Sequence, residues 1–75
     1  MNNDRRKQLR EIITVLEDVK CDLEAIRDDE QEYMDNMPEN LQGSDRYDAA
    51  EEAVDNMDDA LNYLEDVMDY ISEAI

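Results

Sequence analysis

The sequence predicts an all-α protein: an antiparallel helical hairpin of coiled-coil type that dimerises into a four-helix bundle. Two observations predict this fold. Apolar residues recur along two segments at alternating steps of three and four, which is the spacing of a heptad seam. The only proline, Pro38, and the only glycine, Gly43, lie between those segments, so the chain has one turn. We expect a single domain, residues 1–75, with a helix over 4–35, a turn over 36–44 and a helix over 45–75.

Each segment carries one apolar seam. The first has a single polar interruption, Glu30, and otherwise consists of Leu9, Ile12, Leu16, Val19, Leu23, Ile26, Tyr33 and Met37. The second has no polar member and consists of Tyr47, Ala50, Val54, Met57, Leu61, Leu64, Met68, Ile71 and Ile75. Folding the chain back at the turn pairs Leu9 with Ile75, Leu16 with Met68, and Leu23 with Leu61. The same register places Glu30 near Ala50 and Val54. A helix start with an N-cap is expected at Gly43-Ser44-Asp45.

The second helix is apolar over a wider arc than one neighbouring helix can cover. Alanine or valine recurs every seven residues beside its seam, and two tyrosines lie just beyond. A 75-residue chain also needs a further stabilising device, and its single Cys21 cannot form an internal disulfide. We therefore expect a homodimer, and the predicted interface is Ala53, Ala60, Tyr63, Val67, Tyr70 and Ala74. Ile13 and Val15 flank the seam of the first helix.

The net charge of −16 is unevenly distributed. Residues 1–27 carry six basic and six acidic residues, whereas residues 28–75 carry seventeen acidic residues against Arg46 alone. Phosphates would be repelled, so direct binding of nucleic acid is disfavoured and a basic protein surface is the natural complement. The basic N-terminal turn, which contains Arg5, Arg6, Lys7 and Arg10, is expected to pair with Asp69 and Glu73 across the hairpin. The alternative is that it serves as a nucleic-acid-binding arm or a membrane anchor.

No residue pattern points to catalysis, a cofactor or a metal. Most carboxylates project from the polar faces of the helices, where a solvated surface is the simplest interpretation. The turn lacks the alternating aspartates of a calcium loop, and the chain has no histidine for a di-iron site. The surroundings of Cys21 do not favour an activated thiol. Without a signal peptide or a membrane-length apolar run, an unpaired cysteine suggests the cytoplasm.

One row of carboxylates is regular enough to be a candidate binding site. It follows steps of three and four along the second helix, interrupted only at Asn62, and consists of Glu52, Asp55, Asp59, Asp66, Asp69 and Glu73. At ~1.5 Å rise per residue these steps are about 5 Å, comparable with the ~3.4 Å between phosphates along a DNA strand. The row could occupy a phosphate-binding groove of a basic protein. The alternative is that any acidic helix shows this spacing, and the charge only keeps a small bundle soluble.

A second hypothesis is a structural or regulatory module that binds another helical protein through the apolar strip.

The turn has two possible roles. It is longer than a helical hairpin requires, so it serves either as a capped end of the core, closed by Met37 and Leu41, or as a recognition tip.

The stretch Glu32–Tyr47, followed by Ala49-Ala50-Glu51-Glu52-Ala53, resembles a family of small acidic helical proteins from phages and other mobile elements of Gram-positive bacteria. The most specific part of the resemblance is the turn, Asp35 to Ser44. The family has no settled function, so the resemblance implies no active residues. It implies by analogy an inhibitor of a host defence or DNA-handling enzyme.

Overall fold

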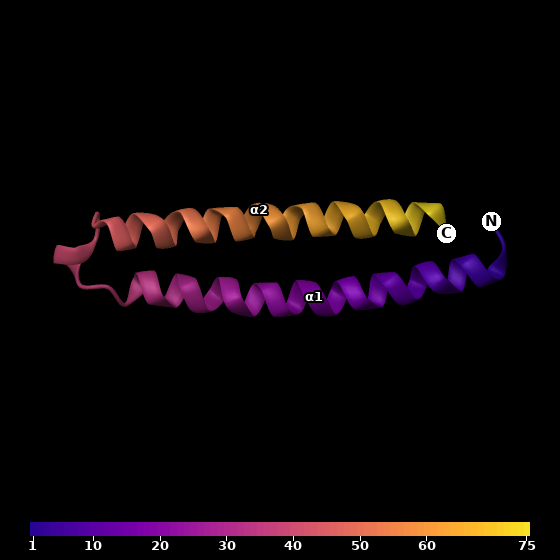
Figure 1. The fold of residues 1–75 in the computed structure, drawn as a ribbon, viewed down its shortest axis with the longest axis horizontal. Helices are drawn as coiled ribbons and strands as arrows, with labels where there is room; N and C mark the ends of the chain where they lie inside the picture. The colour runs from indigo at the N-terminus through magenta and orange to yellow at the C-terminus, as the bar shows by residue number, and fades with distance from the viewer.

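Two long helices lie side by side in opposite directions and make up nearly all of the molecule (Figure 1). The computed structural model describes residues 1–75. Helix α1 spans Asn3–Asp35, a short 3₁₀ helix η1 spans Glu39–Leu41, and helix α2 spans Asp45–Ala74. The hairpin is elongated, 59 × 15 × 12 Å, and both termini lie at the end opposite the turn. The predicted all-α antiparallel hairpin is confirmed.

The helix ends are capped by side chains that the sequence supplies locally. Oδ1 of Asn2 accepts a hydrogen bond from the backbone N–H of Arg5 at 2.8 Å, and Oγ of Ser44 accepts one from Tyr47 at 3.3 Å. Gly43, just before the second cap, has φ +89°, a conformation that glycine adopts without strain. Ser44 is therefore the N-cap expected at the start of the second helix.

The core is thin because a two-helix hairpin has only one interface between helices in which side chains can be buried. Four residues are buried: Met34, Ala50, Val54 and Met68. The first three form a cluster near the turn, with Tyr47 packed against it. Every member of the seam predicted for α2 is buried or half-buried, so that seam is confirmed.

The seam predicted for α1 is wrong at four positions. Ile12, Val19, Ile26 and Tyr33 are each between 44% and 59% exposed. Their C-terminal neighbours Ile13, Lys20, Arg27 and Met34 are half-buried or buried instead. Helix α1 is thus rotated by about one residue from the orientation that hydrophobicity alone favours. Leu9, Leu16 and Leu23 are half-buried in either orientation.

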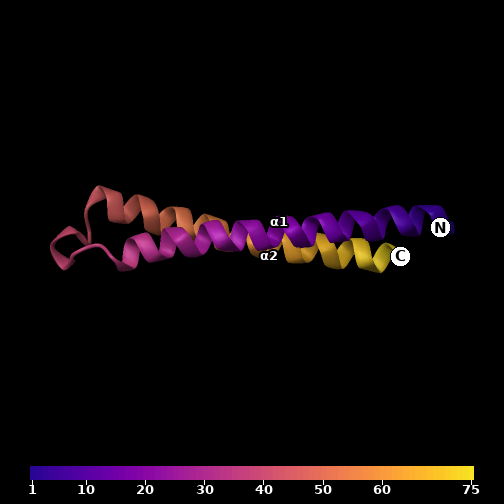
Figure 2. The ribbon, with the colours of Figure 1, turned by 90° about the horizontal axis from the view of Figure 1, so that it is seen from below.

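Facing charges on α2 explain the rotation. Nε of Arg27 donates to Oδ1 of Asp58 at 2.8 Å, and Nζ of Lys20 donates to Oε1 of Glu65. Figure 2 shows the same two helices seen from below. The aliphatic stems of lysine and arginine can cover apolar surface while their charged ends reach solvent or a carboxylate. These two residues therefore occupy the edge of the helix contact, and Val19 and Ile26 turn outwards.

The expected pairing at the N-terminal end is also wrong. Every ion pair in the chain involves Lys20 or Arg27, so neither Asp69 nor Glu73 is paired with the basic turn. Arg6 instead donates from Nε to the backbone carbonyl of Ile75 at 3.3 Å. This bond closes the open end of the hairpin, while Arg5, Lys7 and Arg10 remain exposed.

Candidate functional site

The acidic row predicted on the second helix lies on the surface of α2. All six of its carboxylates are exposed, and none of them forms an ion pair within the chain. We call this row the acidic strip: Glu52, Asp55, Asp59, Asp66, Asp69 and Glu73. Because these residues are offset from Val54, Leu61 and Met68 around the helix, the strip points away from α1. Near the C-terminal end Tyr70 lies beside Asp66, Asp69 and Glu73 in a shallow depression.

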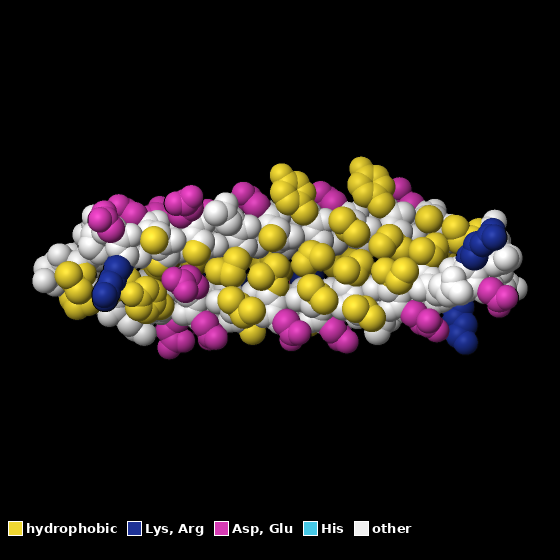
Figure 3. Space-filling model, in the orientation of Figure 1, with side chains coloured by type: hydrophobic (Ala, Val, Ile, Leu, Met, Phe, Trp, Pro, Cys, Tyr) yellow, Lys and Arg dark blue, Asp and Glu magenta, His cyan; other side chains and the backbone are white.

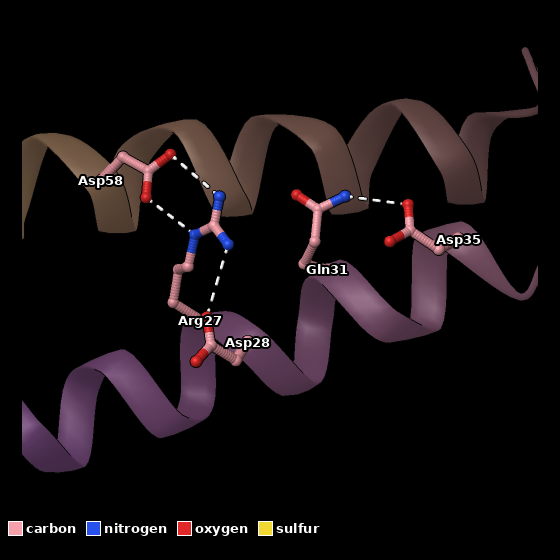
Figure 4. A network of polar contacts seen from close by, with 5 residues as sticks. All are labelled: Arg27, Asp28, Gln31, Asp35 and Asp58. Atoms are coloured by element: carbon pink, nitrogen blue, oxygen red, sulfur yellow. Dashed lines mark hydrogen bonds and ion pairs between the residues drawn. The ribbon is translucent and has the colours of Figure 1, made fainter.

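Other carboxylates are engaged inside the hairpin, which sets them apart from the acidic strip. Asp58 accepts two hydrogen bonds from Arg27, at 2.8 and 3.4 Å, and Asp28 accepts a third at 3.4 Å (Figure 4). Lys20 lies between Glu65 and Glu24, with its Nζ 3.7 Å from Glu24. The hydrogen bond to Glu65 raises the pKa of Lys20, and the hydrogen bond to Asp58 raises the pKa of Arg27. Of these contacts, the pairs Lys20–Glu65 and Arg27–Asp58 join the two helices.

Apolar side chains gather on one broad face of the molecule, across both helices (Figure 3). On α2 the face includes Tyr63 and Tyr70, which are 68% and 73% exposed. We call this surface the apolar face. Its α1 members are Ile12, Val15, Val19, Ile26 and Tyr33, and its α2 members are the six predicted interface residues, Ala53, Ala60, Tyr63, Val67, Tyr70 and Ala74.

The ion pairs show that the two rows of this face share one side of the hairpin. Lys20 meets Glu65 along one edge of the contact between the helices. On α1, Val19 lies across the seam from Lys20, and on α2, Val67 lies across the seam from Glu65. Both valines therefore border the opposite edge, where the two apolar rows meet. Asp58 and Arg27 mark the same polar edge about two helical turns closer to the loop of the hairpin.

Sequence reasoning found the α2 half of the apolar face and missed most of the α1 half. Val15 was expected to flank the seam and is exposed, but Ile13 is half-buried against α2. Ile12, Val19, Ile26 and Tyr33 had been assigned to the internal seam. The doublet Ile12-Ile13 was the available signal, because two adjacent isoleucines lie about 100° apart around a helix and so widen its apolar surface beyond a single seam.

The turn contains the largest surface hollow of the molecule, lined in part by Tyr33, Met37, Pro38 and Leu41. Met37 is half-buried, and Leu41 is 48% exposed. Met37 thus contributes to closing the end of the core, whereas Leu41 stands largely outside it.

The remaining candidate features lie apart from these surfaces. Cys21 is exposed and its thiol is free. No group of three or more acidic, cysteine or histidine side chains is arranged to hold a metal ion. Neither helix has a stretch long and apolar enough to cross a membrane.

Fold and surface together define an antiparallel two-helix protein with an apolar face and an acidic strip that borders it at Tyr70. No protein-family model, curated protein or solved structure matches the chain.

Proposed function

We propose that this protein is a non-enzymatic acidic binding protein that occupies a basic, nucleic-acid-binding surface of a partner protein. The acidic strip supplies the contact, with Asp55, Asp59, Asp66 and Asp69 at its centre. The protein would act as a mimic of a phosphate row and so inhibit a DNA-handling or defence enzyme. The resemblance of the turn to proteins of phages and mobile elements is the basis for the inhibitory role.

The observation that supports this proposal most strongly is that the carboxylates of the acidic strip are exposed and form no ion pairs within the chain. By contrast, the same chain pairs Asp58 and Glu65 with cations of α1. A carboxylate already held by a lysine or arginine would lose that partner on binding a basic surface, whereas a free one would not. The strip also runs along a rigid helix, so little conformational entropy is lost when it docks.

The proposed active form is a homodimer. A thin core with four buried residues and two largely exposed tyrosines supports association through Ala53, Ala60, Tyr63, Val67, Tyr70 and Ala74. Dimerisation through this side of α2 covers surface that borders the acidic strip at Tyr70 and provides two strips per particle. Replacing Ala60 with arginine tests the interface: the variant should be monomeric, and a variant that stays dimeric contradicts it.

A matched pair of charge reversals tests the binding function. Asp59→Lys with Asp66→Lys reverses two carboxylates of the acidic strip. Glu11→Lys with Asp18→Lys makes the same change in net charge at two exposed, unpaired positions of α1. Native protein and both variants are tagged, exposed to bacterial lysate, and washed at low and then high salt before captured proteins are identified.

The proposal predicts that native protein and the α1 variant capture the same basic nucleic-acid-binding protein. That protein should leave at high salt, because exposed charges are screened, and the strip variant should not retain it. Equal capture by the strip variant and native protein contradicts the proposal, as does the absence of any captured basic protein.

The apolar face favours one alternative, a structural or regulatory module that binds another helical protein. That partner would contact Ala53, Ala60, Tyr63, Val67 and Tyr70.

Binding of such a partner should persist through the high-salt wash and should be lost when Tyr63 and Tyr70 are replaced by serine. A captured protein that leaves at high salt and is retained by the double serine variant contradicts this alternative.

A further inference from the structure

The hairpin exposes more surface than a compact monomer of its mass. A folded monomer of this mass exposes about 4,800 Å² on the usual size scaling. This chain exposes 5631 Å². The excess of about 850 Å² matches the ~800 Å² that each partner buries in a standard protein interface. The radius of gyration, 17.3 Å, likewise exceeds the ~11 Å expected for a compact domain of 75 residues.

Like charge limits where a second copy can approach. Each chain carries a net charge of −16, and carboxylates line both margins of the apolar face in Figure 3. Two copies that met through their acidic strips would repel each other. Contact between two copies through the apolar face buries the most apolar surface and brings the fewest like charges together. A second copy is therefore the partner that fits this face.

Three members of each apolar row are evenly spaced about a valine. On α1, Ile12 and Ile26 each lie seven residues from Val19, and on α2, Ala60 and Ala74 each lie seven residues from Val67. The pairing of Lys20 with Glu65 places both valines at nearly the same level along the hairpin. A twofold axis that crosses the molecule at this level would set Val19 against Val19, and Val67 against Val67. Ile12 would then lie opposite Ile26 of the other copy, and Ala60 opposite Ala74.

A twofold axis along the length of the hairpin would also bring apolar rows together. The distribution of charge favours the axis across the hairpin over the axis along it. Residues 28–48, around the turn, carry eight acidic residues and one basic residue. An axis along the length would place the two turns side by side. An axis across the length places each turn beside the basic N-terminal end of the other copy, where Arg5, Lys7 and Arg10 form no internal ion pair.

We infer that the apolar face is covered by a second copy of this chain, with α1 packed antiparallel against α1 of its partner and the two turns at opposite ends. This inference rests on the dimer of the proposed function. It adds the relative direction of the two copies and the part of the interface that α1 contributes. It explains why α1 begins basic and ends acidic, the opposite of what its own helix dipole favours. Lys7 of each copy would lie near Asp29 of the other, on the outer edge of the contact.

Distances between spin labels test the direction of the dimer. Gln42, which is exposed in the turn, is replaced by cysteine in a Cys21→Ser background, and the labelled protein is measured by double electron–electron resonance. The inference predicts a separation of about 50 Å or more, since each turn is more than seventeen residues from the axis at ~1.5 Å per residue. The control label on native Cys21, two residues from the axis, should give a short distance in either arrangement.

A charge exchange provides a second test, read as molar mass by light scattering. Lys7→Glu and Asp29→Arg should each weaken the homodimer about tenfold or more, because like charges then face each other. An equal mixture of the two variants should restore the dimer, since one interface then pairs Glu with Arg in reversed positions.

The outcomes separate this inference from the dimer on which it rests. Native protein with the mass of one chain overturns both. A native dimer with a short distance between the turn labels, or with no rescue in the mixture, overturns the antiparallel arrangement and leaves the dimer intact. A native dimer with distant turns and a rescued mixture supports the inference.

Discussion

Nε of Arg27 on α1 donates a hydrogen bond to Oδ1 of Asp58 on α2 at 2.8 Å, while the preceding residue, Ile26, is largely exposed. This one contact relates the interior of the hairpin to its surface. Because Arg27 turns towards α2, Ile26 must turn away from it. The other residues of the row from Ile12 to Tyr33, spaced by seven, turn outwards with it. The rotation of α1 thus produces the α1 half of the apolar face.

The Arg27–Asp58 pair predicts a difference between two adjacent substitutions. Asp58→Lys places a cation against Arg27 and should lower the midpoint of thermal unfolding. Asp59→Lys makes the same change of charge at an exposed, unpaired residue and should lower it less or not at all. Circular dichroism at 222 nm measures both. Equal midpoints for the two variants would show that the pair does not stabilise the contact between the helices.

The raised pKa of Lys20 predicts how stability changes at alkaline pH. Its hydrogen bond to Glu65 is the main cause, so the cation is favoured in the folded chain. Its contribution is fully present below the pKa of an unfolded lysine, ~10.4, and is lost as pH rises through the higher folded value. Denaturant midpoints of native protein and Lys20→Gln should therefore converge above that pH. A constant difference from pH 7 to 12 would contradict this origin.

The cluster near the turn predicts the largest loss of packing energy. Met34 is buried beside Ala50 and Val54, so Met34→Ala should cost about 2–5 kcal/mol of the free energy of unfolding. Glu32→Ala, two residues away and exposed, should change it by less than about 0.5 kcal/mol. Urea unfolding followed by circular dichroism measures both changes. A loss below about 1 kcal/mol for Met34→Ala would contradict the position of the core.

Gly43 predicts a backbone effect that involves no side-chain contact. Apart from its two chain neighbours, nothing lies within 4 Å of where a Cβ would stand at this position, but its φ is +89°. Gly43→Ala should therefore destabilise the hairpin by about 1 kcal/mol through strain alone. Gly43→Asn should cost less, because asparagine adopts positive φ more readily. If both substitutions were neutral in urea unfolding, the turn would have a different backbone conformation.

The sequence was sufficient to predict the hairpin because the signals for it are local. Heptad spacing, Pro38 and the Gly43-Ser44 cap are each read from a few neighbouring residues, and the predicted bounds 4–35 and 45–75 differ from those observed by one residue. The seam of α2 was predictable because every position in it is apolar. The six carboxylates of the acidic strip are exposed as their spacing implied, but their role in binding stays a prediction.

The rotation of α1 could not be predicted from hydrophobicity. At residues 19–20 and 26–27 the apolar residue precedes a cation, and apolar spacing selects Val19 and Ile26 for the interior. The outcome depends on Asp58 and Glu65, more than thirty residues away in the sequence, which attract the cations to the edge of the contact. The same limit applies to Arg6, whose contact with the carbonyl of Ile75 replaced the expected pairing with Asp69 or Glu73.

The central claim is that a second copy covers the apolar face, and two neighbouring substitutions test it most directly. Ile26 belongs to the apolar face, whereas Ala25 is exposed on the outer side of α1. Sedimentation equilibrium of Ala25→Lys should give twice the 8.8 kDa mass of the chain, as for native protein, and Ile26→Lys should give the mass of one chain with its helical content retained. Equal masses for the two variants, or a monomeric native protein, would contradict the claim.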